Sequence, residues 1–201
     1  LPLVYRNGTD LQSQGRWRDS NLVRWFDDTL RPIGGWRTRS DTASAGQVRG
    51  MHSWIANNSD RWIAAGSYNK LYVYSGAGIQ YDITPTGFTA GNEDALTPVG
   101  YGNSFYGREY YGTPRQESVT ITPATTWSLD SFGEYLVACS STDGKVYEWQ
   151  LNTGAIAAVI SNAPVNNRAI LVTEERFLMC LGAGGNPRLV QWSDRENNNL
   201  W

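Results

Sequence analysis

Arg61–Tyr74 reads RWIAAGSYNKLYVY and predicts two short β-strands joined by a turn at Ser67-Tyr68-Asn69. The pattern returns at 134–149 as EYLVACSSTDGKVYEW and at 176–192 as RFLMCLGAGGNPRLVQW. Each copy opens with a charged residue and an aromatic, and its second strand runs from a cation to an aromatic: Tyr74, Trp149 and Trp192. A unit of this kind that recurs along a chain indicates a repeat architecture.

Further strand patterns surround each copy. Residues 47–55 and 79–83 complete a four-stranded unit around the first, 127–129 and 155–160 do so around the second, and 169–173 opens the third. Four short antiparallel strands with tight turns make one blade of a β-propeller. We therefore predict an all-β chain, a β-propeller with about three blades visible. Because closure needs about four blades or more, we expect these to be part of a larger or incompletely recorded propeller.

Two segments do not follow this repeat. Residues 1–45 are predicted to form an extended arm rich in Arg and Trp, and residues 46–201 to form the blades. Residues 85–126 lack strong periodicity and read as an insertion whose aromatic residues favour an interaction loop, with a short strand at 118–122. A weakly patterned piece of a blade is the alternative for this stretch.

Composition separates the arm from the rest. The 201-residue chain is 40% hydrophobic and has a net charge of −2, so it is expected to fold, and its overall charge names no partner. Residues 1–40 hold seven Arg and four Asp, a net of +3, which leaves the remainder at −5. Arg interleaved with Trp is typical of interfaces. The predicted interface residues are Arg16, Trp17, Arg18, Arg24, Trp25, Arg31, Trp36 and Arg37. The alternative is an ordinary first strand with Arg on its solvent face.

Candidate chemistry is sparse. The single histidine, His52, falls in a predicted strand, and the two cysteines, Cys139 and Cys180, sit among apolar neighbours and read as buried free thiols. We therefore predict no metal site, no cofactor and no catalytic residues. Paired carboxylates such as Asp82 with Glu93 or Asp94 have no supporting spacing, and polar clusters at 57–60 and 194–199 read as turns. The sequence contains no run of 18 apolar residues, so we predict no membrane span.

The arm and the chain's last residues resemble the nozzle, or DNA-stabilisation, β-propeller tail proteins of short-tailed bacteriophages. In the arm the resemblance rests on Ser13–Gly15, Asn21–Val23 and the run DDTLRPIGGW at 27–36; at the other end it rests on PRLVQWSDRENNNLW at 187–201. Asp28 and Thr29 stand where the family more often has Gly.

The resemblance implies a structural protein of the virion tail, not an enzyme. It implies self-association into a ring, expected to be a hexamer, below the portal and adaptor, where it retains and channels the genome. Its expected partners are the portal, the adaptor and other tail proteins. Non-specific contact with DNA in the channel is a further expectation. The alternatives are a propeller protein-binding module of cellular origin and a propeller that binds or hydrolyses glycans.

Overall fold

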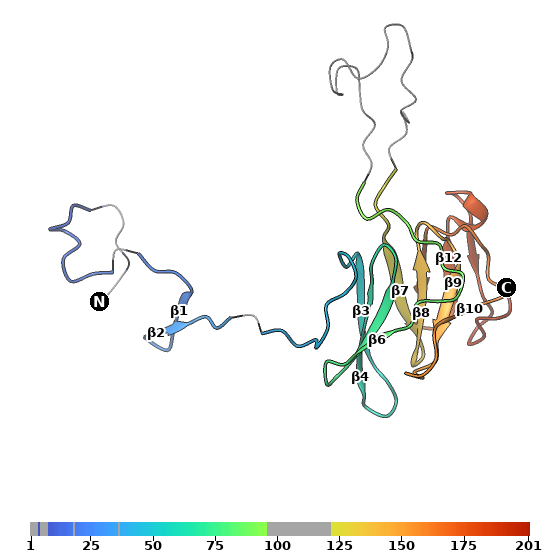
Figure 1. Ribbon diagram of the computed structural model, residues 1–201, viewed down its shortest axis with the longest axis horizontal. Helices are drawn as coiled ribbons and strands as arrows, with labels where there is room; N and C mark the ends of the chain where they lie inside the picture. The colour runs from blue at the N-terminus through green and yellow to red at the C-terminus, as the bar shows by residue number, and fades with distance from the viewer. Residues whose placement is uncertain (1–3, 5–7, 18, 36, 96–121) are drawn as a thin grey trace, which may run out of the picture. The chain divides into compact units, whose positions relative to one another are not determined.

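The computed structural model describes residues 4, 8–17, 19–35, 37–95 and 122–201 of the chain (Figure 1). The chain divides into two compact units, Leu1–Thr38 and Arg39–Trp201. The described residues form β-strands and no α-helix, which confirms the all-β prediction. The strands assemble into four small antiparallel sheets.

The first unit contains a β-hairpin that the sequence did not predict. Strand β1 (Val23–Phe26) pairs with β2 (Thr29–Pro32) in a segment expected to be extended with turns. The two residues between them, Asp27 and Asp28, have φ values of 51° and 54°. Positive φ at both central positions is the geometry of a type I′ turn, whose twist matches that of paired strands. Asp-Asp is a weaker signal for this turn than Asn-Gly or Asp-Gly, which is why the hairpin was missed.

The second unit contains three sheets in chain order. Sheet 1 comprises β3 (Gly50–Ile55), β4 (Arg61–Gly66), β5 (Leu71–Ser75) and β6 (Gln80–Asp82). Sheet 2 comprises β7 (Trp127–Phe132), β8 (Tyr135–Ser140), β9 (Val146–Trp149) and β10 (Ala158–Val159). Sheet 3 comprises β11 (Ala169–Val172), β12 (Leu178–Leu181) and β13 (Val190–Trp192), with a 3-10 turn η1 at Ala183–Gly185. Each predicted strand of the three repeats is present.

The sheets pack face to face in sequence, and two hydrophobic clusters fill the two interfaces. Between sheets 1 and 2 lie Trp54, Trp62 and Val73 on one side and Tyr147 and Trp149 on the other. Between sheets 2 and 3 lies the second cluster, which includes Val137, Cys139, Val146, Leu178 and Cys180. First strands of neighbouring sheets are also in contact, β3 with β7 and β7 with β11.

Burial along the strands follows from this order. In β8, five consecutive residues are buried, because sheet 2 is covered on both faces. In β4, Trp62 and Ala64 are buried on the face toward sheet 2, while Ile63 on the other face is exposed. Ala65 on that other face is buried because the segment that contains Ala45 covers part of it. Strands buried on both faces lose the alternation of apolar and polar residues.

In the third copy of the repeat, the second strand pairs with the first in a register that differs by one residue from that of the other two copies. Tyr74 lies opposite Ile63, and Trp149 lies opposite the equivalent Leu136. Trp192 lies instead opposite Met179, so it projects from the other face of its sheet. A one-residue shift in register moves a side chain to the opposite face. The longer connection between β12 and β13, which holds η1, produces this shift.

The predicted insertion is also narrower than 85–126. Phe88 stacks on Trp127 with ring centroids 5.2 Å apart and packs against the cluster between sheets 1 and 2. Farther along, the Thr125 amide donates to the Asn92 carbonyl at 3.0 Å, which brings the two ends of the segment together. The predicted strand at 118–122 lies outside the described residues except for Thr122.

Candidate interaction surfaces

The N-terminal hairpin presents a basic and aromatic face. Arg24 on β1 lies directly opposite Arg31 on β2, and Phe26 shares their face because side chains two residues apart point the same way. The guanidinium carbons of Arg24 and Arg31 lie 5.5 Å and 5.2 Å from the centre of the Phe26 ring. Like charges directly opposite each other destabilise a sheet, and cation–π contacts with one shared ring offset part of that cost. No carboxylate pairs with either guanidinium among the described residues.

The opposite face of the same hairpin is apolar. Val23 lies opposite Pro32, and Trp25 lies opposite Leu30. Trp25 retains 45% of its surface exposed. An isolated two-stranded hairpin is marginally stable in water, so we expect this face to gain stability from a covering surface.

The predicted interface residues are only partly brought together. Arg24, Trp25 and Arg31 lie on the hairpin, with Trp25 on the apolar face. Trp17 is exposed and forms an isolated backbone β-bridge with Val4. Arg16 and Arg37 are exposed and lie outside the strands. Arg18 and Trp36 lie outside the described residues. The sequence prediction missed Phe26. The alternation of side chains in VRWF before Asp27-Asp28 indicates a strand that places Phe26 on the face of Arg24.

Glycine at the hairpin turn tests its conformation. Replacing Asp28 with glycine is expected to stabilise the hairpin by about 0.5–1 kcal/mol, because glycine adopts positive φ without the side-chain penalty. Amide hydrogen exchange across β1 and β2 should become slower. As a control, Thr29→Gly should speed exchange, since it places glycine in a strand and removes the Thr29 hydroxyl that donates to the Phe26 carbonyl. Faster exchange in Asp28→Gly would contradict the type I′ geometry.

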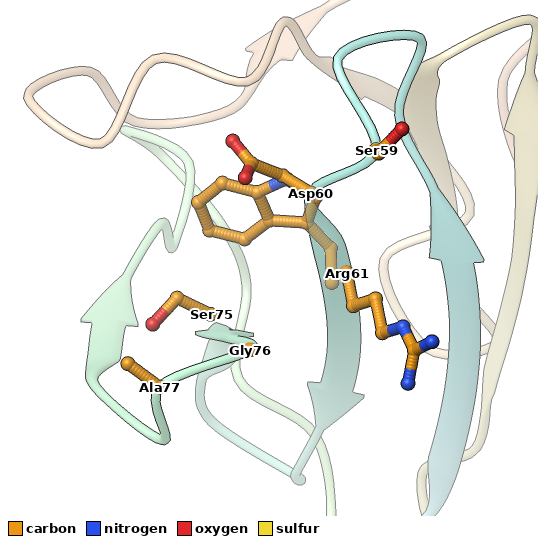
Figure 2. Close-up of a pocket in the computed structure, with 7 residues that line it drawn as sticks. Ser59, Asp60, Arg61, Ser75, Gly76 and Ala77 are labelled. Atoms are coloured by element: carbon orange, nitrogen blue, oxygen red, sulfur yellow. The ribbon is translucent and has the colours of Figure 1, made fainter.

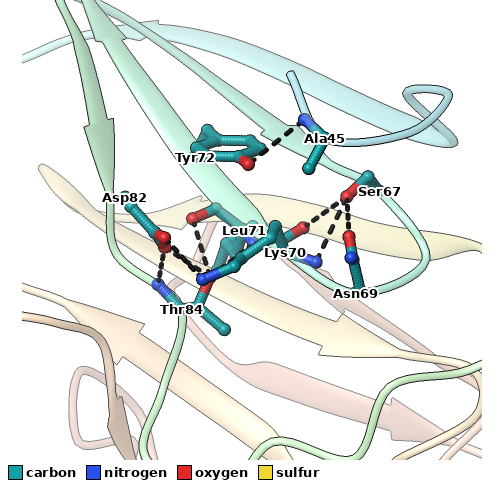
Figure 3. A network of polar contacts seen from close by, with 8 residues as sticks. All are labelled: Ala45, Ser67, Asn69, Lys70, Leu71, Tyr72, Asp82 and Thr84. Atoms are coloured by element: carbon teal, nitrogen blue, oxygen red, sulfur yellow. Dashed lines mark hydrogen bonds and ion pairs between the residues drawn. The ribbon is translucent and has the colours of Figure 1, made fainter.

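A polar network ties the turns of sheet 1 together (Figure 3). Lys70 Nζ lies 2.8 Å from Asp82 Oδ2, and the Thr84 amide donates to Asp82 Oδ1 at 2.9 Å. The Ser67 hydroxyl accepts from the Lys70 amide in the turn before β5. Tyr72 accepts at its hydroxyl from the Ala45 amide, which holds the segment before β3 against β5. The network is structural, since each polar group in it serves to close a turn or strand end.

Stability should depend on pH through Asp82. Burial acts to raise the pKa of Asp82, but hydrogen bonds from Lys70 and Thr84 and the Lys70 charge outweigh it and hold that pKa below its usual value. The pair's contribution is therefore present above the unfolded pKa of about 3.9 and is lost as pH falls through the lower folded value. Asp82→Asn should cost less than about 1 kcal/mol at pH 7, because the pair is half exposed.

Urea unfolding between pH 7 and pH 2 measures this dependence. The difference between Asp82→Asn and the unmodified chain should shrink toward zero at the acid end. Asp28→Asn, at the exposed hairpin tip, is the matched control and should show no such trend in the unfolding of Arg39–Trp201. A difference that stays constant down to pH 2 would contradict the assignment.

A pocket of about 450 Å³ opens on sheet 1. It is lined by Ser59, Asp60, Arg61, Trp62, Ser75, Gly76 and Ala77. Figure 2 shows Asp60 on the same side of β4 as Ser75 and Ala77, with the Arg61 side chain directed away from them. Trp62 Nε1 and Ser75 Oγ are buried and have no hydrogen-bond partner among the described residues. Such groups cost about 1–3 kcal/mol unless water or a polar ligand satisfies them.

The remaining candidate groups take structural positions. His52 lies on β3, stacks on Trp54 and is 3.3 Å from the Ser131 hydroxyl. Cys139 and Cys180 are buried free thiols, as predicted, and burial raises the pKa of each to about 12. Asp94 pairs with Arg49 at 2.9 Å.

The described part of the chain holds neither a cluster of metal-binding side chains nor a membrane-spanning helix. No group of three or more His, Cys, Asp or Glu side chains is placed there to hold a metal ion. No helix there is long and apolar enough to cross a membrane.

No family model, curated protein or solved structure matches the chain.

The C-terminal motif has a clear packing role. After β13, the Asp194 amide donates to the Leu200 carbonyl at 2.7 Å and closes a loop. Asn198 in that loop is buried and donates to Glu148 on β9. Trp201 packs against the cluster between sheets 2 and 3, and its indole donates to the Asn198 carbonyl at 2.8 Å. The polar run before the final Trp thus attaches sheet 3 to sheet 2.

Proposed function

We propose that sheets 1–3 are successive blades of a β-propeller and that the chain is a structural tail protein of a short-tailed bacteriophage. In this role it forms a ring, expected to be a hexamer, below the portal and adaptor of the virion. It retains and channels the genome and catalyses no reaction. Consecutive antiparallel sheets packed in chain order, with first strands in contact, support the propeller part of the proposal.

The N-terminal hairpin is the observation that carries the functional part. It belongs to a compact unit distinct from the sheets, and it carries two arginines that face each other around one aromatic ring. Arginine and aromatic residues are enriched where proteins meet, and arginine also recognises carboxylates and phosphates. We assign this hairpin the contact with neighbouring copies or with the adaptor. The phage resemblance of 13–36 covers the same segment.

Removing residues 1–38 tests the proposal. The remaining chain should keep its β circular-dichroism signal and a cooperative unfolding transition, because the network of sheets begins at Arg39, whose side chain donates to the Gly76 carbonyl. Ring formation and co-purification with portal and adaptor should be lost. Arg24→Ala with Arg31→Ala in the full chain should reproduce the loss, and Arg195→Ala, at an exposed arginine of the second unit, is the matched control.

Two results would overturn the proposal. One is a full chain that forms no ring and does not associate with portal or adaptor proteins. The other is a truncated chain that assembles as the full chain does.

The pocket on sheet 1 favours one alternative, a propeller module that binds a small polar ligand. Asp60 offers a carboxylate there, and the unpartnered Trp62 Nε1 and Ser75 Oγ are buried in residues that line the pocket. A glycan array would separate the two functions. Retention of a glycan that is lost in Asp60→Ala supports the binding module.

A further inference from the structure

Each of the three sheets has two faces, named here by the order of the sheets along the chain. The face toward the next sheet is the leading face, and the face toward the preceding sheet is the trailing face. On trailing faces, Leu136 and Leu178 occupy the same repeat position, and both are buried. On leading faces, Ala64 and Val137 share a position and are likewise buried.

Two faces remain open among the described residues, one of them only in part. On the trailing face of sheet 1, Ala65 and Tyr72 are buried beside the segment that contains Ala45. The open part of this face carries Ile63 at the Leu136 position and Met51, which is 67% exposed. The leading face of sheet 3 carries Met179 at the Val137 position and Trp192, which is 59% exposed. Both faces therefore have the apolar character of the faces that meet inside the molecule.

The leading face of sheet 3 is also hollowed. A shallow pocket of about 300 Å³ is lined by Thr173, Glu175, Phe177, Met179 and Trp192. The shift in register described above brings Trp192 to this face, where it forms part of the wall. Large aromatic residues beside an apolar hollow are typical of contact centres.

Charge identifies what fits this surface. In both internal interfaces, the first residue of each repeat copy lies beside the turn between the first two strands of the preceding sheet. Glu134 of sheet 2 accepts from the Asn57 amide of sheet 1 at 3.2 Å. The Arg176 guanidinium of sheet 3 would lie 3.9 Å from a Cβ placed on Gly133 of sheet 2.

The same position in sheet 1 is Arg61, and the first turn of sheet 3 contains Glu174 and Glu175, both exposed. A trailing face brought onto sheet 3 in the geometry of the internal interfaces would therefore place Arg61 against two glutamates. Figure 2 shows Arg61 directed away from Ser75 and Ala77, which line the pocket with Trp62 of the leading face. The two uncovered faces are thus complementary both in apolar character and in charge.

We propose that sheet 3 binds the trailing face of sheet 1 of a second copy of this chain. The contact joins two different faces, so it is head to tail, and such contacts form closed rings when the rotation closes. This inference depends on the repeat and not on the phage assignment.

The mass of the full chain in solution tests the proposal, measured by light scattering after size exclusion between about 1 and 100 µM. Trp192→Glu and Met51→Glu, both on exposed side chains, should each weaken the head-to-tail contact at least about tenfold, because each leaves a charge at its apolar centre. Trp25→Ala in the hairpin is the matched control and should leave this contact intact.

A charge reversal tests the pairing itself. Arg61→Glu should weaken association about tenfold, as should Glu174→Arg with Glu175→Arg. An equal mixture of the two variants should regain association, because a mixed pair has one contact in which both charges are reversed and one in which both are unchanged. Circular dichroism of each variant confirms that it is folded.

A chain that is monomeric throughout this concentration range would overturn the proposal. So would association that persists unchanged in both Trp192→Glu and Met51→Glu, or a mixture that associates no better than its components. The hairpin variants Arg24→Ala and Arg31→Ala separate this contact from the proposed tail ring, since they should abolish the ring and spare the head-to-tail contact.

Discussion

Replacing Trp149 with alanine is expected to lower the free energy of unfolding of the three-sheet unit by about 3–5 kcal/mol. Trp149 is 1% exposed and lies at the centre of the interface between sheets 1 and 2. Its ring meets Trp62 and Trp54 edge to face, with centroids 5.2 Å and 6.5 Å away. The substitution opens a cavity and removes these contacts, and the neighbouring sheets cannot collapse fully into the space.

The indole nitrogen adds to this loss. Trp149 Nε1 donates to the carbonyls of Asn152 and Ala155, at 3.0 Å and 3.1 Å, and so fixes the turn that leads to β10. Since domains are stable by only about 5–15 kcal/mol, the variant should unfold at far lower urea concentration.

Urea unfolding followed by circular dichroism measures the effect. Trp25→Ala is the matched control, because Trp25 lies on the hairpin outside the three-sheet unit; its effect on this transition should stay within about 0.5 kcal/mol. A loss of less than about 1 kcal/mol in Trp149→Ala would show that the two sheets do not share this core.

Replacing Gly66 with alanine is expected to cost about 3 kcal/mol, the upper end for overpacking a core. A Cβ at this position would lie 2.3 Å from Cγ and Cδ1 of Trp127. The indole cannot move away easily, because its Nε1 donates to the Ser67 carbonyl at 2.6 Å and its ring stacks on Phe88. One methyl group therefore forces β4 and β7 apart.

Gly76→Ala is the matched control for this substitution. A Cβ at Gly76 would lie 3.5 Å from the Arg61 carbonyl, an ordinary contact, and neither glycine has a positive φ. Its free energy of unfolding should therefore change by no more than about 0.5 kcal/mol. Equal effects of the two substitutions would contradict a steric cause at Gly66.

The sequence predicted the strands of the sheets well, and for a definite physical reason. Within Arg61–Tyr74 the turn residues, the aromatic residues and the alternation are local signals, and they recur in each copy. The observed β4 has the predicted ends, Arg61 and Gly66, and β5 begins one residue later than predicted. Local signals suffice for such strands because their hydrogen bonds join neighbours in the chain.

The interaction surfaces were predicted less completely. The sequence singled out Arg24, Trp25 and Arg31 as interface residues, but only pairing across β1 and β2 shows that Trp25 faces away from the two arginines. The same limit applies to Trp192, which the repeat pattern aligned with Trp149. In both cases the face that a side chain occupies depends on register, which a one-residue change reverses.

By itself, the sequence determined the all-β class, the three repeats and the turns between strands, because these depend on residues close together in the chain. The tertiary structure decided which faces of the sheets meet and which remain uncovered. It also showed that Phe88 belongs to the core and that Gly66 makes room for Trp127. These features arise from contacts between sheets distant in sequence, where side-chain volume and register act together and no local pattern records the outcome.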